Sequence, residues 1–441
     1  FPNITIAPKS YLLIFASGKD RNTSELHANF KISSEGEALY LSNPEGTIID
    51  YIAALNLGED DSFGKLPDGS NNLIHLEYSS PGSSNNNTSQ LIFSSPAGFY
   101  DEAFNLNIQS LLGDTIYYTL DGSIPTINSN VFTDSIFIHN RSSEPNYFSK
   151  FPTSPDQSLI SYKAWESPSI TLDKANIVRC ISINDGIPTS KVYTNTYFID
   201  ENIFNKYSLP IISLITEEDN LFDSDSGIYI PGVNFNINNP EWTGNYFQSG
   251  IKWEKPFHIE YFDKNGILGF SQDAGLRIHG GKTRQAAQKS MRLYAREEYG
   301  KKYFNYPLIP QREHSEYKRF ILRTTMGSWH DQSIIKDVLA HEIAKDLDIE
   351  TQGFQPVLVF LNGEYWGIHT LRDKIDEYYI NYKFDVDKDS VDLIGGNYNL
   401  IFAGDNSHYK NILEFIKNNN LNESNNYEYV KTQIDIHKIY L

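Results

Sequence analysis

Alternating apolar and polar positions predict β-strands along most of this chain. Within residues 1–80, the apolar run 38–41 ends at the turn sequence 43–46, and residues 47–51 resume the alternation, which predicts a hairpin. Residues 91–200 contain further short strands, punctuated by Asp-Gly and by proline. This spacing is typical of β-sandwiches, so we expect an all-β sandwich over 91–200, preceded by a β-rich region.

From Leu209 onwards the pattern mixes strands with helices. A long helix is predicted over residues 331–349, because apolar positions recur there three and four residues apart and should face the core. The stripe consists of Ile334, Ile335, Val338, Leu339, Ile343 and Leu347. Asn362-Gly363 between two apolar runs predicts a tight hairpin, and shorter helices are expected at 378–382 and 409–416. Residues 201–441 are therefore predicted to form an α+β domain.

The stretch 275–296 contains the most informative side chain of this domain. Alternation stops at Gly280-Gly281 and resumes through Met291, Leu293 and Ala295, and the same period places Lys289 on their inward face. Burying an ammonium without a partner costs several kcal/mol, so this lysine requires an anion, and a nucleotide phosphate is one candidate. The alternative is a lysine whose stem lies on apolar surface while its ammonium reaches water.

Gly280-Gly281-Lys282-Thr283 invites comparison with a phosphate-binding P-loop. That pattern needs an earlier glycine at the position of Leu276, and Gly275 is one residue out of register. It also needs a helix after the lysine, where the alternation of residues 290–295 predicts a strand. We therefore reject a P-loop.

The charge balance limits the classes of partner. The 441 residues carry a formal net charge of −19, with a pI near 5.0, so the chain should repel a nucleic-acid backbone. A local basic patch suits a compact anion better than a long polyanion; it comprises Lys282, Arg284, Lys289, Arg292 and Arg296. One cysteine excludes an internal disulfide, and no apolar run approaches the roughly 18 residues of a membrane span. The chain shows no signal peptide and begins with Phe1, so we expect a piece of a longer protein.

A glycine loop, a strand with an inward lysine and a helix with an acid follow one another in this domain. In protein-kinase small lobes, a strand lysine binds nucleotide phosphates and a helix glutamate holds it. Glu342 flanks the apolar stripe of the predicted helix, so a contact with Lys289 is one possibility. The other is that Glu342 is an ordinary solvent-facing helix residue.

Several ordered motifs resemble the CotH kinase family, atypical kinases related to spore coat protein H. They are GLRIHGGKTR at 275–284, QKSMR at 288–292, WHDQS at 329–333, Lys336-Asp337 and LNGEYWG at 361–367. The resemblance implies an ATP- and magnesium-dependent kinase that transfers the γ-phosphate to serine of cell- or spore-surface proteins. It makes Lys289 the phosphate-binding lysine, with Arg277, Arg284 and Glu342 as further candidate cofactor-binding residues.

The two β-rich regions resemble accessory modules. Residues 1–80 resemble part of a lamin-tail domain, on the pattern from IAPKSYLLIFASGKD to EALYLSNPEGTIID. The resemblance implies a first all-β, immunoglobulin-like sandwich, and 81–90 form a polar linker. The run YYTLDGSIPT places 91–200 close to the chitobiase/hexosaminidase C-terminal module, a fibronectin-like domain. Tyr117 and Tyr118 are interpreted as sheet residues, with sugar stacking as the alternative. Such modules imply an extracellular or cell-surface protein with possible glycan contacts.

One departure from the family bears on activity. The family's catalytic aspartate and metal ligands lie in motifs of the Asp-Trp-Pro-Gly-Asn-Asn and Asp-x-Asp-Phe kinds, which do not occur here. Asp435 is no substitute, because no asparagine follows at the required spacing. We therefore expect a kinase-like domain that lacks its C-terminal part, with no catalytic or metal-binding residue and no phosphate transfer by these 441 residues. The competing hypothesis is a non-catalytic surface scaffold that binds carbohydrate or cell envelope.

Overall fold

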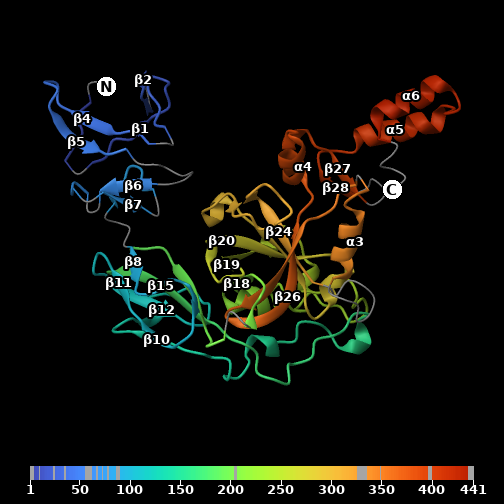
Figure 1. Cartoon of the computed structure of the whole chain (residues 1–441), viewed down its shortest axis with the longest axis horizontal. Helices are drawn as coiled ribbons and strands as arrows, with labels where there is room; N and C mark the ends of the chain where they lie inside the picture. The colour runs from blue at the N-terminus through green and yellow to red at the C-terminus, as the bar shows by residue number, and fades with distance from the viewer. Residues whose placement is uncertain are drawn as a thin grey trace.

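The computed structural model describes residues 4–8, 10–22, 25–33, 36–54, 62–65, 68–71, 73–76, 79–85, 90–202, 206–324, 335–347, 349–395 and 400–435. Three parts follow one another: an N-terminal β region, a β-sandwich and a barrel that carries C-terminal helices (Figure 1). None of the helices in these ranges has the length and apolar composition that a bilayer span requires.

The N-terminal part consists of small sheets. Their strands are β1 (Ile14–Phe15), β2 (Arg21–Asn22), β3 (Leu26–His27), β4 (Leu39–Ser42), β5 (Ile48–Ile52), β6 (Ser62–Lys65) and β7 (Leu73–Leu76). The predicted hairpin is confirmed, because β4 and β5 pair antiparallel and Tyr40 stacks on Tyr51 with ring centroids 5.7 Å apart. Both rings are more than half exposed, so this hairpin does not bury its apolar residues against the described chain.

The second part is a two-layer sandwich. Its strands are β8 (Leu91–Phe93), β9 (Gly98–Tyr100), β10 (Phe104–Leu106), β11 (Ile108–Ser110), β12 (Thr115–Thr119), β13 (Asn130–Val131), β14 (Ile136–Ile138), β15 (Asn176–Asn184), β16 (Ile187–Pro188) and β17 (Tyr193–Ile199). The pairs β8–β11 and β10–β14 cover a larger sheet built on β12, β15 and β17, and alternate residues of both layers form one apolar core. Tyr117 and Tyr118 pair across to β15, which confirms that they are sheet residues.

The third part is built on a closed barrel in the order β18-β19-β20-β21-β24-β26-β25. Its strands are β18 (Ile211–Ile215), β19 (Lys255–Phe262), β20 (Leu268–His279), β21 (Ser290–Tyr294), β24 (Arg319–Arg323), β25 (Phe354–Leu361) and β26 (Glu364–Asp373). Parallel pairing of β18 with β25 closes it. The predicted Asn362-Gly363 hairpin joins β25 to β26 with both residues at positive φ, as a primed turn requires.

The interior of the barrel follows the predicted period. Leu276, Ile278, Met291 and Leu293 are buried in its core, and Lys289 lies on the same inward side with no exposed surface. The inward position predicted for this lysine is thereby confirmed.

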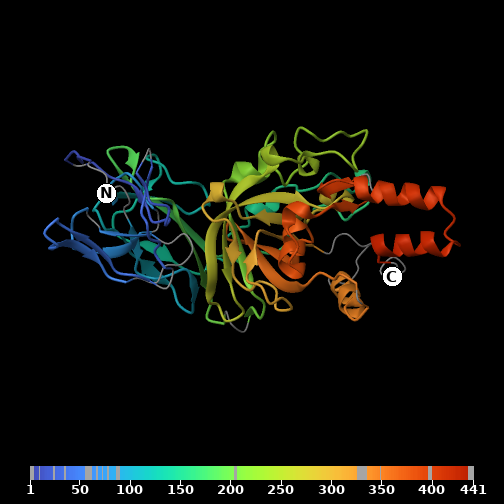
Figure 2. The same ribbon diagram turned by 90° about the horizontal axis from the view of Figure 1, so that it is seen from above.

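Short pairs of strands and several helices surround the barrel. They are β22 (Phe304–Asn305), β23 (Glu316–Tyr317), β27 (Leu393–Gly395), β28 (Leu400–Ala403), α2 (Glu218–Phe222), α3 (Lys336–Ala344), α4 (Glu377–Phe384), α5 (Ser407–Asn418) and α6 (Ser424–Gln433). The helices expected at 378–382 and 409–416 are confirmed as α4 and α5, and α6 was not predicted. Figure 2 shows α5 and α6 projecting from the rest of the chain.

The long predicted helix differs from the expectation. Of the range 331–349, residues 331–334 and 348 lie outside the described residues, and α3 covers Lys336–Ala344. No residue of α3 is buried, and Ile335, Leu339 and Ile343 are at least half exposed. The prediction that this stripe faces the core is wrong, because the barrel interior is already filled by its own strands.

The sandwich and the barrel share a buried polar and aromatic seam. The chain between β14 and β15, residues 139–175, runs beneath the barrel (Figure 1). There the Glu364 carboxylate of β26 accepts hydrogen bonds from the backbone N–H groups of Tyr147 and Ser149, both at 2.8 Å. Phe198 of the sandwich packs edge-on against Phe360 with centroids 5.0 Å apart. These two parts therefore form a continuous structure.

Candidate functional site

Lys289 is enclosed by its own chain. Its ammonium donates to the carbonyl oxygens of Arg284 at 2.7 Å and Ala286 at 2.8 Å, and lies 4.0 Å from the ring centroid of Tyr246. Complete burial lowers the pKa of this lysine well below its ordinary value. The described residues thus supply neither an anion nor a route to water, the two alternatives that the sequence left open. The ammonium is stabilised instead by carbonyl oxygens and aromatic rings.

Of the two alternatives for Glu342, the structure supports an ordinary solvent-facing helix residue over a contact with Lys289. Glu342 lies on the exposed side of α3 and pairs with Lys345 one turn later. Because α3 turns its apolar stripe away from the barrel, the acid beside that stripe points away as well.

Arg277 and Arg284 have separate partners within the protein. Arg277 donates through Nε to the carboxylate of Glu254 at 2.7 Å. The Glu254 side chain has no exposed surface, and its carboxylate also binds Arg296. Arg284 donates to the carbonyl of Gly280 at 2.6 Å and spans the carbonyls of residues 246–248. The roles of the four sequence-predicted residues in cofactor binding stay predictions.

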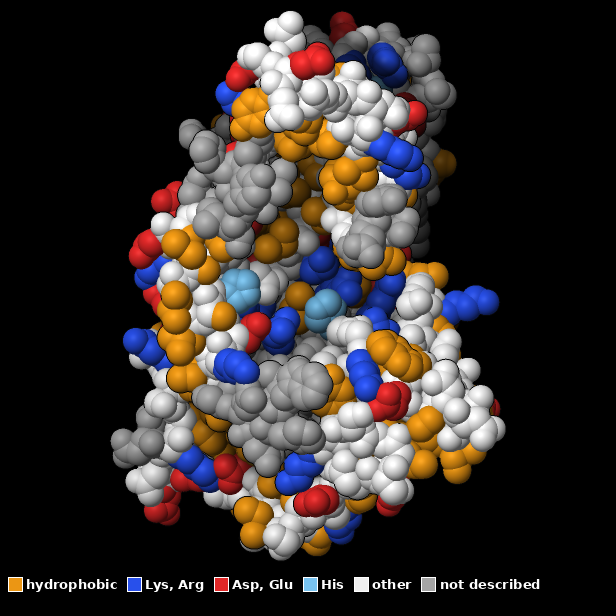
Figure 3. Space-filling view, turned by 90° about the vertical axis from the view of Figure 1, so that its right-hand side faces the viewer, with side chains coloured by type: hydrophobic (Ala, Val, Ile, Leu, Met, Phe, Trp, Pro, Cys, Tyr) orange, Lys and Arg blue, Asp and Glu red, His pale blue; other side chains and the backbone are white. Residues whose placement is uncertain are grey.

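Cations gather on the outer surface of four neighbouring strands. The strand register places Arg277 of β20 opposite Arg292 of β21, with Ile321 of β24 and Arg372 of β26 next in the same row. We define the cationic face as Arg277, His279, Arg292, Arg319, Arg323, Arg372 and Lys374, which share this side of the sheet. Figure 3, viewed from the side of α3, shows Lys and Arg side chains collected in a hollow beside histidines.

Positive charge on this face is only partly neutralised. Arg319 binds Asp376 at 2.7 Å, whereas within the part of the chain that the structure describes Arg292 donates only to Nδ1 of His279, at 2.9 Å. Lys374 donates to the carbonyl of Ile375 at 2.9 Å. Burial, with Arg292 and Lys374 nearby, lowers the pKa of His279 to about 3. His279 is therefore a neutral imidazole that accepts from Arg292.

The strongest indication of a ligand site is a buried arginine, Arg372, some of whose hydrogen-bond donors lack an acceptor among the described residues. Arg372 has no exposed surface, and its Nη2 donates to the side chain of Gln352 at 3.3 Å. Among the described residues, its Nε and Nη1 find no hydrogen-bond acceptor, and neither does Nε of Arg292. Nη1 of Arg372 lies 3.0 Å from Oδ2 of Asp337 without hydrogen-bond alignment. Buried polar groups are nearly always bonded, so donors of this kind mark a place suited to an anion.

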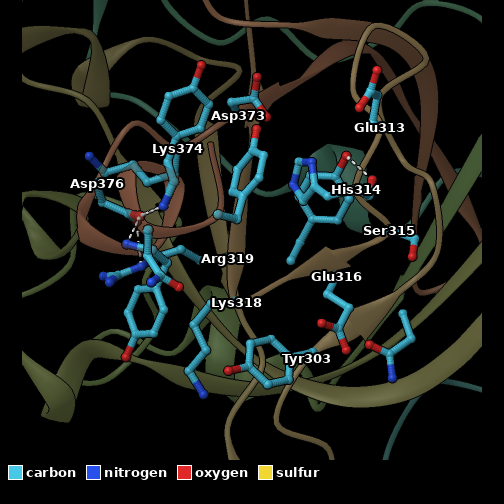
Figure 4. Close-up of a pocket in the computed structure, with 16 residues that line it drawn as sticks. Tyr303, Glu313, His314, Ser315, Glu316, Lys318, Arg319, Asp373, Lys374 and Asp376 are labelled. Atoms are coloured by element: carbon cyan, nitrogen blue, oxygen red, sulfur yellow. Dashed lines mark hydrogen bonds and ion pairs between the residues drawn. The ribbon is translucent and has the colours of Figure 1, made fainter. Parts of the chain in front are cut away.

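A pocket of about 560 Å³ adjoins the cationic face. Arg319 and Lys374 belong to both (Figure 4). Its wall combines aromatic rings with polar and charged side chains, four of them acidic. The aromatic residues are Tyr303, His314, Tyr317, Tyr378, Tyr379 and Tyr382. Such rings offer stacking surfaces to a flat ligand group.

The described residues do not fit a magnesium site. No group of three or more His, Cys, Asp or Glu side chains in these ranges is placed to hold a metal ion. Magnesium needs carboxylate and phosphate oxygens, and the cationic face offers mainly donors. The expected magnesium dependence stays a prediction, and no chemical step is assigned to a metal here.

The fold defines a β-sandwich joined to an α+β domain that carries the cationic face. Two parts of the chain match models of known protein families. Residues 276–440 match the family described as CotH kinase protein, and residues 95–194 match the chitobiase/beta-hexosaminidase C-terminal domain. Both resemblances are thereby confirmed, whereas the lamin-tail resemblance has no such match and stays a prediction. A search of curated proteins found no match to the chain.

Binding of a polyphosphate is expected to raise the pKa of His279. Adding negative charge beside Arg292 and Lys374 offsets the repulsion that keeps the imidazole neutral, and a nearby opposite charge shifts a pKa by about 1–3 units. NMR of the imidazole between about pH 8 and pH 5 should show chemical shifts that do not change with pH in the free protein. With tripolyphosphate bound, the shifts should change toward pH 5 as the imidazole takes up a proton. His139 in the sandwich is the internal control, and an identical His279 response with and without tripolyphosphate would contradict the assignment.

Proposed function

We propose that the chain binds a nucleoside triphosphate on the cationic face, as the nucleotide-binding part of an atypical protein kinase. The observation that carries the proposal is Arg372, which is buried and whose Nε and Nη1 have no hydrogen-bond acceptor among the described residues. It lies in the same row of the sheet as Arg292, with β24 between them. The CotH kinase match over residues 276–440 supports ATP as the nucleotide.

The phosphates fit the middle of the face. Among the described residues, no carboxylate forms an ion pair with Arg292 or Lys374, so an incoming triphosphate replaces no strong ion pair there. Arg372 has one carboxylate partner, Asp337. Guanidinium groups bind phosphate oxygens through paired donors, which fixes the orientation of the ligand as well as its charge. Neutral His279 orients the Arg292 guanidinium by accepting a hydrogen bond from its Nη2–H.

The base fits the tyrosine-lined pocket. Arg319 and Lys374 belong to both regions, so a nucleotide extending from the pocket reaches the phosphate-binding cations along a single surface. Tyr378 lies beneath Arg319, whose guanidinium carbon is 4.9 Å from the ring centroid, and this stacking keeps the ring at the junction.

The chemistry proposed for the intact protein is transfer of the γ-phosphate to serine hydroxyls of extracellular or surface proteins, with the sandwich as an accessory module that contacts glycan or envelope. What the described residues contribute is binding, orientation and neutralisation of phosphate charge, which are the main protein contributions to phosphoryl transfer.

Calorimetry with ATP, tripolyphosphate and adenosine tests the proposal. We expect ATP to bind more tightly than either part, because base and phosphates have separate subsites. Arg292→Gln should weaken ATP and tripolyphosphate binding by about tenfold to a hundredfold, since a charged hydrogen bond is worth about 1.5–3 kcal/mol. Adenosine binding should be unchanged in this variant.

Two controls accompany the measurement. Arg292→Lys keeps the charge and should retain part of the affinity, and Arg141→Gln removes a sandwich arginine that pairs with Glu144 and should bind like wild type. Equal ATP affinity in Arg292→Gln and wild type would overturn the assignment of the face. Since these 441 residues are expected to transfer no phosphate, a longer chain that includes the family's catalytic motifs separates the two hypotheses. ATP binding by that chain without phosphate transfer to serine-containing surface proteins would favour the non-catalytic scaffold.

A further inference from the structure

Helix α3 places a carboxylate on the cationic face. Asp337 lies with Oδ1 3.2 Å from Nη2 of Arg323 and with Oδ2 3.0 Å from Nη1 of Arg372. One carboxylate thus bridges two arginines on adjacent strands, as two oxygens of a phosphate do. The spacing of its oxygens and its charge make Asp337 a partial mimic of a bound phosphate.

The contacts that attach α3 to the barrel are polar. The helix buries no residue, and its stripe of Ile335, Leu339 and Ile343 is open to solvent in the described structure. Besides the Asp337 ion pairs, His341 accepts a hydrogen bond from the backbone N–H of Gln352 at 3.1 Å. A nine-residue helix has little stability of its own, so its position depends on such contacts.

We infer that Asp337 is an internal competitor of the phosphate ligand, so that docking of α3 and occupation of Arg323 and Arg372 by phosphate exclude each other. The inference rests on the proposed function, because it concerns regulation of the same site. Imperfect alignment supports it: Oδ2 of Asp337 and Nη1 of Arg372 are close but not hydrogen-bonded. A tetrahedral phosphate presents oxygens in more directions than a planar carboxylate and satisfies these donors better.

Linkage gives the consequence for α3. If Asp337 weakens phosphate binding by some factor, phosphate weakens α3 docking by the same factor. Ligand binding then releases the helix from the face and returns Asp337 to solvent. The opposing interpretation is that Asp337 orients the two arginines for the ligand, in which case removing it weakens binding.

Asp337→Asn separates the two interpretations, with inorganic tripolyphosphate as the probe. Competition predicts that the variant binds tripolyphosphate about tenfold more tightly than wild type in calorimetry at low salt. Orientation predicts weaker binding. Asp346→Asn is the matched control, because it removes one exposed carboxylate just beyond the same helix, and its affinity should equal that of wild type.

Hydrogen exchange gives an independent readout. In wild type, tripolyphosphate should increase amide exchange across Lys336–Ala344, and in Asp337→Asn exchange should be high already and insensitive to ligand. Equal or weaker binding by Asp337→Asn, with wild type still binding, overturns this inference alone. Absence of binding by wild type and both variants overturns the proposed function as well. Because α3 buries no side chain, neither substitution should unfold the barrel.

Discussion

Glu364→Ala is expected to lower the free energy of unfolding by about 3 kcal/mol or more. The side chain is almost fully buried, and its two oxygens accept the backbone N–H groups of Tyr147 and Ser149. Alanine leaves both donors unpaired at the seam, and each lost charged hydrogen bond costs about 1.5–3 kcal/mol. Buried Lys174 also loses the carboxylate that favours its charged form. Urea unfolding measures the total effect.

Matched variants test the cause of this loss. Glu364→Gln keeps one acceptor oxygen and should fall between alanine and wild type. Glu166→Ala removes an exposed carboxylate from the same 139–175 segment and should change stability little. Hydrogen exchange should show lost protection at the amides of residues 147 and 149 in Glu364→Ala, and unchanged protection there would contradict the proposed contacts.

Lys289→Met is expected to remove a pH dependence of stability. Burial lowers the pKa of Lys289 well below its ordinary value near 10.5, which the unfolded chain retains. Between these two values the unfolded chain holds one more proton than the folded chain. The free energy of unfolding of wild type therefore rises with pH in this window, by up to about 1.4 kcal/mol per pH unit, and falls as the pH drops toward the folded pKa. Methionine lacks this contribution.

Denaturant unfolding of wild type and Lys289→Met at about pH 7 and about pH 10 measures the difference. The stability of wild type relative to the variant should increase toward the higher pH. Lys301→Met replaces an exposed lysine, and its difference from wild type should stay constant. A constant difference for Lys289→Met would mean that the carbonyls and the Tyr246 ring keep the ammonium charged at every pH tested.

The inward side of Lys289 was predictable from the sequence, and its partners were not. A strand period of two fixes which side a residue faces, and Met291 and Leu293 identify that side as the core. Tyr229 and Tyr246, whose rings lie within 5.5 Å and 4.0 Å of the ammonium, come from loops far away in the sequence. No local pattern specifies that meeting.

The cationic face could not be predicted from the sequence for a related reason. Arg323, Arg372 and Lys374 occupy ordinary alternating positions, and nothing in either strand shows that they will lie in neighbouring rows. Their grouping depends on the register of β21, β24 and β26, which long-range pairing sets. The error on α3 had another origin: an apolar stripe identifies one side of a helix but does not say what covers it.

The seam between sandwich and barrel has a consequence for how the protein is held. The boundaries of the two matched families fall within a body that shares the Glu364 and Phe198–Phe360 contacts. A partner that binds the sandwich therefore also sets the orientation of the barrel, because the described seam packs the two against each other. Attachment to a surface through the sandwich would aim the cationic face in one direction, so that anchoring selects which neighbouring molecules can reach it.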